Sequence, residues 1–462
     1  MLQTVKQQVR LMHKNTKTNM TTFHKGGVHP EENKLARDSK IEVMPLTKKA
    51  VVFVSQHLGA PATCVVQKGD KVKVGTLLSK AEAFICANVH SPYSGTVTKI
   101  DVATDFNGVK KPAVYIDVEG DEWEENIERS TDIVHKINLE GKQIIERMKD
   151  RGIVGLGGAA FPTNVKYMIP ENKKAEFLII NGVECEPYLT SDNRIMLERT
   201  EEIFIGIEIM KKALNLNNAL IGIEENKPEA IAAMTEMSDK FPGTKVVPLK
   251  MKYPQGAEKQ LINALTGREV PSGKLPIEVG CVVDNVGTAL AVYEAVQKNK
   301  PLIDNVITFT GKSCNVQKNL LVRVGTPLYE IIDYCGGLPT DTAKLISGGP
   351  MMGKAIMDTT APTVKTTSSI LVMNEQEAKR GKETACIRCG KCIEACPMGL
   401  EPLLLATLSQ NRRWEDAEKE SVMDCIECGC CLFTCPANRP LLDRIRVGKN
   451  QVGAIRRARA QK

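Results

Sequence analysis

A repeated cysteine pattern near the carboxyl end carries the clearest chemistry in the sequence. Four cysteines and a proline follow the spacing Cys-x2-Cys-x2-Cys-x3-Cys-Pro from Cys386 to Pro397, and the same pattern returns from Cys425 to Pro436. A [4Fe–4S] cube needs one soft thiolate for each iron, and three cysteines at this spacing on a tight loop can reach three corners of one face. The doubled run therefore predicts two [4Fe–4S] clusters.

The fourth ligand of each cluster must come from outside its own three-cysteine loop. In two-cluster proteins with this spacing, the last cysteine of each run binds the cluster of the other run. This rule assigns Cys386, Cys389, Cys392 and Cys435 to one cluster, and Cys425, Cys428, Cys431 and Cys396 to the second. Zinc is the alternative metal, but zinc sites favour two Cys-x2-Cys pairs separated by a longer loop. Cys430 fits neither set, and we expect it to be a buried or neighbouring thiol.

A glycine-rich segment, RGIVGLGGAAFPTNVK at residues 151–166, is the second candidate site. It places Gly155 and Gly157 ahead of Lys166. Glycines let backbone N–H groups approach a phosphate closely, and a following lysine adds positive charge. The spacing differs from the GxGxxG of a dinucleotide-binding fold, so a plain turn is the competing interpretation. Three polar strings follow in the same region and favour a binding site: NGVECEP from Asn181, YPQGAEKQ from Tyr253 and VDNVGT from Val283.

The patterns around these motifs indicate which elements hold them. Residues 41–118 alternate short β-branched runs with glycine-containing turns, which predicts a small all-β unit. From about residue 132, apolar strands alternate with helical runs, which favours a parallel α/β sheet. A compact α+β module is expected at about 304–360, and the chain from Ile370 is expected to be mostly helical between the cysteine runs.

Composition limits the class of protein. With 462 residues, 42% of them hydrophobic and 25% charged, the chain is an ordinary globular protein of about three or four domains. Every apolar stretch is interrupted before the ~18–20 residues that span a bilayer, so we expect any membrane role to be peripheral. Fifteen cysteines, nine of them between 386 and 435, are too sparse for a disulfide scaffold and indicate a metal site in the reducing cytoplasm.

Both ends of the chain are basic. Residues 1–20 lack the apolar core of a secretory signal, so we expect no export, and Met20 is a candidate natural start. Residues 442–462 carry seven cations against Asp443. This tail could lie on anionic lipid or dock an acidic partner protein of the same complex. We expect no nucleic-acid partner, because the tail has no aromatic residue on which bases could stack.

The glycine-rich loop and the three polar strings resemble the flavin-binding, NADH-oxidising subunit of respiratory complex I over roughly residues 150–360. The whole chain resembles the C subunits of Rnf electron-transport complexes, beginning with the FHKGGVHPEENK signature from Phe23. This resemblance implies a multidomain α/β and α+β protein. Its expected parts are an N-terminal extension with a biotinyl/lipoyl-like β barrel-sandwich (1–130), a complex-I-like, Rossmann-type FMN/NADH domain (131–303), an SLBB β-grasp domain (304–365) and a helical 2[4Fe–4S] ferredoxin-type domain with the basic tail (366–462).

The resemblance also implies roles for individual residues. Gly155, Gly157 and Lys166 would contact the flavin phosphate or ribityl chain. Asn181, Glu184, Asp284, Asn285 and Thr288 would line the flavin. Phe161, Glu186 and Glu258 would face the nicotinamide. The chain departs from the complex I pattern at Val183, where that family has an acidic residue, and at 284–288, which reads DNVGT instead of NNVET.

The implied function is electron input to a membrane-associated, ion-translocating ferredoxin:NAD+ oxidoreductase. NADH would exchange electrons through FMN and two [4Fe–4S] clusters with membrane subunits, including an iron–sulfur subunit, and indirectly with ferredoxin. The expected location is the cytoplasmic side of the bacterial membrane. Two alternatives stay open: a soluble flavin-dependent cobalamin reductase of bacterial metabolosomes, which has the same domain order, and a non-enzymatic iron–sulfur relay without flavin. The FHKGGVHP signature favours the first interpretation over the cobalamin reductase.

Overall fold

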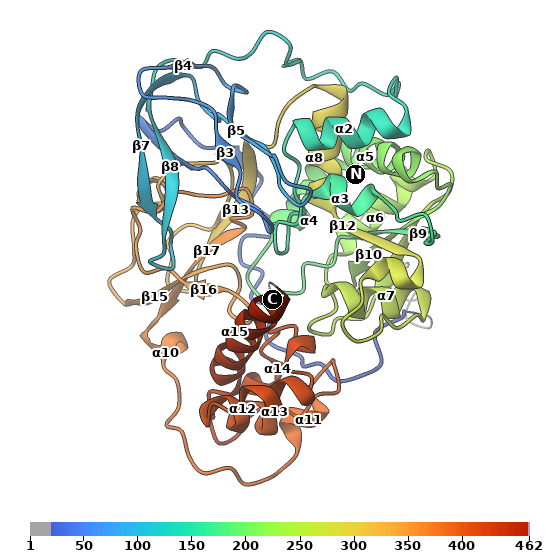
Figure 1. Cartoon of the computed structure of the whole chain (residues 1–462), viewed down its shortest axis with the longest axis vertical. Helices are drawn as coiled ribbons and strands as arrows, with labels where there is room; N and C mark the ends of the chain where they lie inside the picture. The colour runs from blue at the N-terminus through green and yellow to red at the C-terminus, as the bar shows by residue number, and fades with distance from the viewer. Residues whose placement is uncertain (1–19, 461–462) are drawn as a thin grey trace, which may run out of the picture.

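The computed structural model describes residues 20–460. The preceding basic stretch, in which we expect no export signal, lies outside the described residues. Figure 1 shows a β-rich part at the upper left, an α/β part at the right and a helical part at the lower end. No helix within the described residues has the length and apolar character needed to cross a membrane.

The β-rich upper part contains the expected barrel-sandwich. One sheet has the order β2 (Lys49–Phe53), β8 (Lys110–Val118), β7 (Gly95–Thr104) and β4 (Lys71–Val72), and the second has the order β3 (Thr63–Cys64), β5 (Leu77–Lys80) and β6 (Val89–His90). Alternating apolar side chains of both sheets, including Leu78 and Val97, form a common core. The all-β prediction is confirmed.

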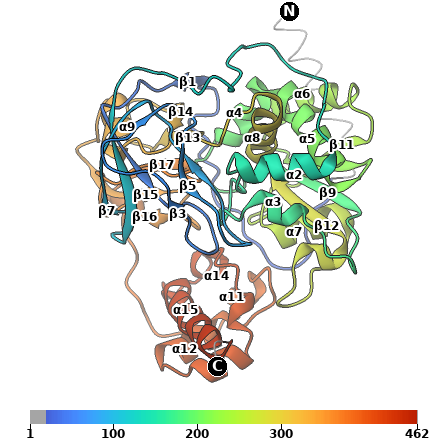
Figure 2. The same ribbon diagram turned by 45° about the horizontal axis from the view of Figure 1, so that its top comes forward.

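The α/β part is built on a four-stranded parallel sheet, as expected. Its order is β11 (Thr244–Leu249), β10 (Ala219–Glu224), β9 (Phe177–Asn181) and β12 (Cys281–Asn285). Its helices are α2 (Gly141–Asp150), α3 (Thr163–Tyr167), α4 (Ser191–Glu198), α5 (Thr200–Leu214), α6 (Pro228–Ser238), α7 (Glu258–Thr266) and α8 (Val286–Gln297). Figure 2 shows α2, α5 and α8 together above this sheet. Their apolar faces bury a continuous core with the strands.

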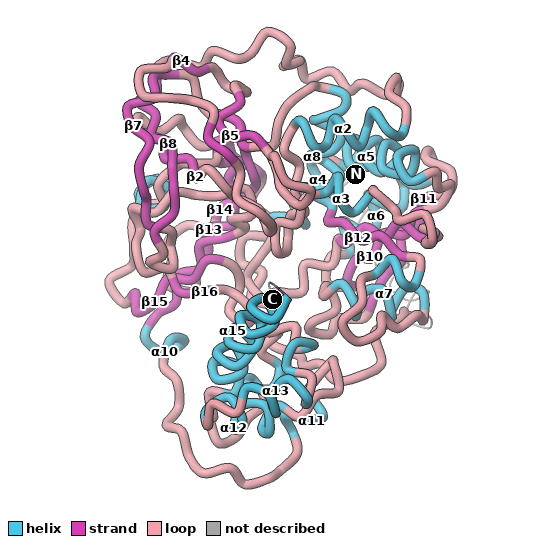
Figure 3. Tube along the Cα trace, viewed as in Figure 1, coloured by secondary structure: helices cyan, strands magenta, loops and turns pink. Residues whose placement is uncertain are grey.

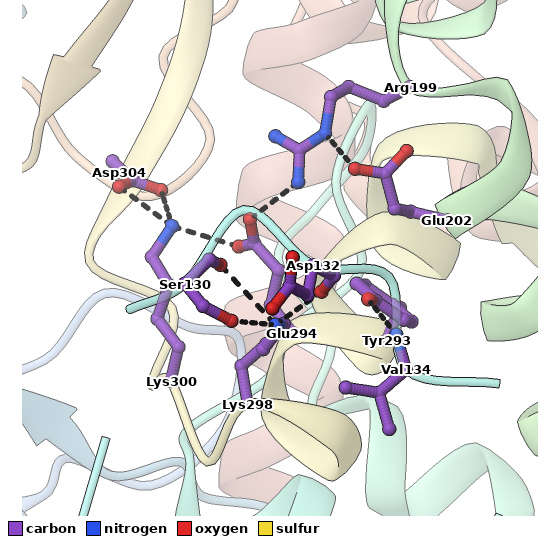
Figure 4. Close-up of polar contacts among 10 residues, drawn as sticks. All are labelled: Ser130, Asp132, Val134, Arg199, Glu202, Tyr293, Glu294, Lys298, Lys300 and Asp304. Atoms are coloured by element: carbon purple, nitrogen blue, oxygen red, sulfur yellow. Dashed lines mark hydrogen bonds and ion pairs between the residues drawn. The ribbon is translucent and has the colours of Figure 1, made fainter. Parts of the chain in front are cut away.

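Polar contacts fix the acidic connector between the first two domains, the stretch GDEWEENIERSTD at residues 120–132 (Figure 4). Lys298, directly after α8, donates to the backbone oxygens of Ser130 and Asp132, and the backbone N–H of Val134 donates to the Tyr293 hydroxyl. Ion pairs continue from this point: Glu294 pairs with Arg199 and Lys300, and Lys300 pairs with Asp304 at the start of the next sheet. The end of α8 therefore anchors the connector and the neighbouring domain together.

The third unit is a six-stranded sheet with one short helix, α9 (Leu328–Tyr334). The strand order is β1 (Ile41–Val43), β14 (Lys318–Arg323), β13 (Asp304–Thr310), β17 (Ser369–Asn374), β15 (Thr342–Ser347) and β16 (Lys354–Ala355). The predicted boundary at 365 is too early, because β17 lies between β13 and β15 and pairs with both. The edge strand β1 also comes from the segment that we assigned to the first domain.

The cluster-bearing part is helical, as expected (Figure 3). Its helices are α11 (Lys391–Glu394), α12 (Pro402–Gln410), α13 (Trp414–Lys419), α14 (Cys430–Phe433) and α15 (Leu441–Ala460), whereas α10 (Glu375–Ala378) directly follows β17 and packs against β15 and β17. Leu405, Ala417 and Ile445 lie in its core. Most cations of the basic tail lie in α15 and form ion pairs within the protein: for example, Arg444 pairs with Glu383 and Arg456 with Glu418.

The N-terminal signature segment, residues 21–40, connects three domains. Thr21 forms a bridge to the end of β11, and Val28 pairs with Tyr253 in the flavin domain. The N–H of Gly27 donates to the carbonyl of Ala395 in the cluster domain at 3.0 Å. Asn319 of β14 donates to the carbonyl of Ala36. The segment 21–40 therefore has a structural role: its FHKGGVHP part contacts the flavin and cluster domains, and Ala36 beyond it contacts the β-grasp domain.

Candidate functional site

The order in which the chain adds strands to the parallel sheet reverses between β9 and β12. From β9 the chain adds β10 and β11 on one side, and then places β12 on the other side. Ligands of open α/β sheets bind beyond the carboxyl ends of the strands at such a switch point. Asn181 ends β9 and Asn285 ends β12, and these two residues lie opposite each other in register. Two of the predicted flavin residues therefore lie where the topology predicts a binding crevice.

The glycine-rich loop lies beside this switch point. The N–H of Leu156 donates to the Thr288 hydroxyl at 2.9 Å, and the N–H of Gly155 donates to the carbonyl of Phe161 at 2.8 Å. Gly157 has φ +76°, and a Cβ there would lie 3.1 Å from the side-chain nitrogen of Asn285. Gly158 has no atom within 4 Å of the corresponding position. The loop thus offers backbone and open space above the strand ends, as a phosphate-bearing cofactor requires.

Lys166 reaches across to the end of β12. Its ammonium group contacts Asp284 Oδ1 and the carbonyl of Val283, each at 2.8 Å. Burial alone would lower the pKa of Lys166, but the adjacent Asp284 carboxylate raises it. The Tyr167 hydroxyl donates to the second oxygen of Asp284 at 3.0 Å. The lysine therefore stays charged and held in place beside the glycine-rich loop.

Asn285 connects the switch point to a carboxylate that sequence reasoning missed. Its side chain accepts the N–H of Gly287 as the N-cap of α8, and it donates to Asp192 Oδ2 at 2.7 Å. Burial, reinforced by the neighbouring Glu184, raises the pKa of Asp192. Asp192 belongs to none of the recognised strings, because it lies at the start of α4 and reaches the site only through the fold.

Glu184 and Asn181 shape the turn that follows β9. Glu184 has φ +47°, and its carboxylate accepts the backbone N–H groups of Asp192 at 2.7 Å and Asn193 at 3.3 Å. It therefore caps the first turn of α4. Asn181 donates to the carbonyl of Gly256 at 2.8 Å and joins two of the predicted polar strings.

Two lysines, one half-buried and one buried, hold the same turn by its carbonyl oxygens. Lys34, from the N-terminal signature, donates to the carbonyls of Glu184, Glu186 and Leu189 at 2.7–2.8 Å. Lys227 donates to the carbonyl of Val183 at 2.6 Å. Burial lowers the pKa of Lys34 to about 8. Sequence analysis gave neither lysine a role, because both act on backbone atoms far away in the chain.

Lys365 also holds a backbone by its carbonyl oxygens, in this case the start of the glycine-rich loop. This fully buried lysine donates to the carbonyl of Gly152 at 2.7 Å and to that of Asn88 in the barrel-sandwich at 2.8 Å. Burial lowers its pKa to about 7. Leu58 of the barrel-sandwich donates its N–H to the carbonyl of Ala160 at 3.1 Å. The barrel-sandwich therefore contacts both ends of the loop.

Glu186 lies at the junction of three domains. Its carboxylate accepts the N–H groups of Met351 at 3.1 Å and Met352 at 2.6 Å, from the β-grasp domain, and it lies 3.4 Å from the Tyr253 hydroxyl. Burial raises the pKa of Glu186 to about 7 against these hydrogen bonds. The Tyr253 hydroxyl also donates to the carbonyl of Cys428 at 2.8 Å. A continuous polar contact thus leads from the flavin-side turn to a cysteine run.

The remaining nicotinamide candidates lie on two other elements. Phe161 is half-buried and ends the glycine-rich loop, and Glu258 is the exposed first residue of α7. Glu258 lies within electrostatic reach of Lys166 and Asp284. Their contact with a nicotinamide stays a prediction.

The two cysteine runs come together in the helical part, and the assignment of each thiol to a cluster stays a prediction. One cavity in the helical part is lined by Cys396 of the first run together with Cys425, Cys428 and Cys431 of the second. Apolar side chains such as Leu405 and Ile445 complete its wall. Cys392 and Cys435, the crossed partners of the other set, lie within electrostatic reach of each other. No three His, Cys, Asp or Glu side chains of residues 20–460 converge on a single-ion site; these four thiols surround a space instead, and their soft donors suit a cube.

The extra cysteine, Cys430, is fully buried, as expected. Its sulfur lies 3.9 Å from the carbonyl of Tyr253. It therefore packs at the contact between the cluster domain and the flavin domain.

The fold and site together define a flavin- and iron–sulfur-containing electron-transfer protein. Residues 148–294 match the Nuo51 FMN-binding domain family, residues 21–121 match the RnfC barrel sandwich hybrid domain, and residues 377–447 match the 4Fe-4S dicluster domain. FMN and two [4Fe–4S] clusters are its cofactors, in agreement with the glycine-rich loop at the switch point and with the two cysteine sets.

Curated relatives extend over nearly the whole chain. The C subunit of the proton-translocating ferredoxin:NAD(+) oxidoreductase complex of Clostridium ljungdahlii is 47% identical over 437 residues, with 94% of each chain covered. The C subunit of the Na(+)-translocating complex of Acetobacterium woodii is 41% identical, over 94% of this chain and 98% of that one. The C subunit of the ion-translocating oxidoreductase complex of Rhodobacter capsulatus is 40% identical, over 94% and 85%. The chain belongs to the family formed by the C subunits of ion-translocating (Rnf) oxidoreductase complexes.

Proposed function

We propose that this protein is the subunit at which NADH exchanges electrons with a membrane-associated, ion-translocating ferredoxin:NAD+ oxidoreductase complex. The observation that carries the proposal is the contact from Glu186 through the Tyr253 hydroxyl to the carbonyl of Cys428. It joins the turn after β9, where we expect the flavin, to the second cysteine run, where we expect a cluster. An electron-transfer protein needs this proximity between its two kinds of cofactor.

The cofactors supply the redox chemistry: bound FMN takes two electrons as hydride and passes them on singly, and the clusters carry single electrons. The chain itself has to bind the FMN, orient it and shield it from water. Gly155, Gly157 and the charged Lys166 would hold the phosphate or ribityl end, and Asn181, Asn285 and Thr288 would line the ring. Glu184 would act mainly by fixing α4 and its turn.

We place the protein peripherally, on the cytoplasmic side of the bacterial membrane. Its partners would be membrane subunits of the complex, among them an iron–sulfur subunit, with NADH/NAD+ as substrate and ferredoxin as an indirect partner. The relatives named as C subunits of ferredoxin:NAD(+) oxidoreductase complexes support this placement. They also favour it over the cobalamin reductase, and the open glycine-rich loop beside Lys166 favours a flavoprotein over a flavin-free relay.

The test compares Lys166→Ala and Glu184→Ala with Lys136→Ala, a control at an exposed lysine that forms no ion pair within residues 20–460. Both site variants should lose NADH-dependent reduction of a soluble dye and bind less FMN, while the iron content stays at about eight atoms per chain, as two four-iron cubes require. Glu184→Gln, which keeps acceptors for the α4 N–H groups, should fold normally. Wild-type dye reduction in both alanine variants would contradict the assignment of the flavin site.

A further inference from the structure

The two cysteine runs have the same local backbone, position for position. Arg388 and Glu427 occupy equivalent places, both with positive φ, at 54° and 58°. The glycines that follow, Gly390 and Gly429, have φ 77° and 80°. Each glycine precedes a four-residue helix, α11 or α14. Any difference between the two loops therefore comes from their side chains and surroundings.

The loop of the second run is covered by the rest of the protein. A Cβ at Gly429 would lie 3.0 Å from the carbonyl oxygen of Met351 in the β-grasp domain. Tyr253 of the flavin domain donates to the carbonyl of Cys428, and Ile426 packs in a cluster with Val28 and Tyr253. This face of the second run is thus an interface between domains within the chain.

The same face of the first run is open. A Cβ at Gly390 would have no atom within 4 Å, and Cys389, equivalent to the buried Cys428, is exposed. Ile387, equivalent to Ile426, is 68% exposed, and the nearby Ile393 is 45% exposed. In Figure 1 the chain between α10 and α11 runs around the lower end of the molecule, far from the barrel-sandwich.

The charges of the two loops also differ. Glu427 pairs within the domain with Arg446 and Lys449 of α15. Its counterpart Arg388, and Lys391 beside it, are exposed, and neither forms an ion pair within residues 20–460. Lys379 and Lys382, between α10 and α11, are equally exposed. Within residues 379–394, Glu394 is the one exposed anion without a cation partner among the described residues, and Glu375, earlier in the chain, is a second. The open face is therefore apolar at Ile387 and positively charged around it.

We infer that this face, formed by Ile387, Arg388, Cys389, Lys391 and Ile393, is the docking surface for an acidic partner protein that carries a one-electron cofactor. The inference rests on the proposed function. It adds the chemistry of the partner with which the first cysteine run exchanges electrons. The partner covers the first loop as the flavin domain covers the second, with an apolar contact at Ile387 and carboxylates opposite Arg388 and Lys391. Apolar contact gives binding energy, and complementary charge gives orientation and fast association.

The test measures binding to inside-out membrane vesicles from cells that contain the other subunits of the complex but lack this one. Arg388→Glu/Lys391→Glu reverses the charge of the loop, and the backbone tolerates Glu at 388 because Glu427 has the same φ in the other run. The matched control, Lys110→Glu/Lys136→Glu, makes the same charge change at exposed lysines of the barrel-sandwich and flavin domains. Arg388→Gln/Lys391→Gln gives a neutral intermediate.

We expect the reversed variant to bind these vesicles about tenfold or more weakly at low ionic strength, with a smaller difference at high ionic strength because salt screens exposed charges. The neutral variant should fall between it and the wild type, and the control should bind normally. Iron content, the electron paramagnetic resonance signals of both clusters and NADH-dependent dye reduction should be unchanged in all variants.

Equal vesicle binding by the wild type and the reversed variant would overturn the inference. So would loss of binding by the reversed variant to protein-free vesicles of anionic lipid to the same extent, because the surface would then recognise lipid. A failure of the proposed function has a different signature: the wild type itself would lack NADH-dependent dye reduction or FMN, whatever its binding to vesicles.

Discussion

The two cysteine runs are alike in sequence and backbone, yet one lies inside the protein and the other lies on its surface. The second run touches the flavin domain through Tyr253 and the β-grasp domain through Met351. The first run, with the same loop, leaves Cys389 and Ile387 exposed. The comparison teaches that spacing makes two alike cysteine loops, whereas their neighbours decide which loop is covered by other domains and which is open to solvent.

The largest expected contrast is between Cys428→Ala and Cys389→Ala. Each variant should retain about four of about eight iron atoms, because each removes a ligand of one cube. In Cys389→Ala, NADH should still reduce the remaining cluster, since its ligands lie on the flavin side. In Cys428→Ala, NADH should leave the remaining cluster oxidised, because the cluster beside Tyr253 is missing. Anaerobic NADH titration followed by electron paramagnetic resonance measures this, and equal reduction in both variants would break the comparison.

Gly429→Ala and Gly390→Ala separate backbone strain from contact. Both substitutions place a Cβ at positive φ, which costs about 1–2 kcal/mol. Only Gly429→Ala also drives that Cβ to 3.0 Å from the carbonyl of Met351, which should add about 1–3 kcal/mol. Calorimetry of the cofactor-loaded protein should therefore show the larger fall in unfolding temperature for Gly429→Ala. Equal falls would mean that the β-grasp loop does not press on the second run.

The free energy of unfolding should depend on pH through Glu224, on the flavin domain that covers the second run. Glu224 accepts the N–H of Lys252, next to Tyr253. Burial raises the pKa of Glu224 from 4.5 to about 7. Between these values the folded protein keeps a proton that the unfolded chain releases, so the free energy of unfolding falls as the pH rises through this window.

Glu224→Gln keeps an acceptor for that N–H and cannot ionise. Its free energy of unfolding should decline less than that of the wild type between about pH 5 and about pH 7.5, by about 2 kcal/mol. Thermal unfolding at several pH values measures this as a smaller decline in unfolding temperature. Parallel curves for the two proteins would show that Glu224 does not titrate in this range.

The smallest expected effect concerns the charges at equivalent loop positions. Glu427→Gln removes two ion pairs to Lys449 and Arg446, whose side chains are partly exposed, and should cost about 1 kcal/mol. Arg388→Gln removes no ion pair within the described residues and should leave the unfolding temperature unchanged. Thermal unfolding at low and high salt measures both, and a salt-sensitive loss in Arg388→Gln would assign Arg388 an internal partner.

Much of the local chemistry was readable in the sequence. The cysteine spacing predicted two ligand sets, and the structure brings Cys396 together with Cys425, Cys428 and Cys431 around one cavity. The alternation of strands and helices predicted the parallel sheet, and the glycine-rich loop lies beside its switch point. These features depend on residues close together in the chain, whose spacing fixes their geometry.

Other features depend on contacts between distant segments. Lys34 holds the turn at Glu184 from about 150 residues away in the chain, and Asp192 reaches Asn285 only because α4 packs beside α8. The boundary expected at 365 was wrong because β17 completes a sheet begun at β13. No local pattern predicts such contacts, because a lysine that binds backbone carbonyls has no sequence signature.

The sequence by itself predicted the two ligand sets and determined the flavin-domain topology and the family, because thiolate spacing and hydrophobic periodicity act over short stretches of chain. Only the tertiary structure decided which cysteine run is covered. That choice depends on how Tyr253 and Met351 pack against one loop while Ile387 and Arg388 meet solvent on the other, and packing between domains is a long-range property that spacing does not encode.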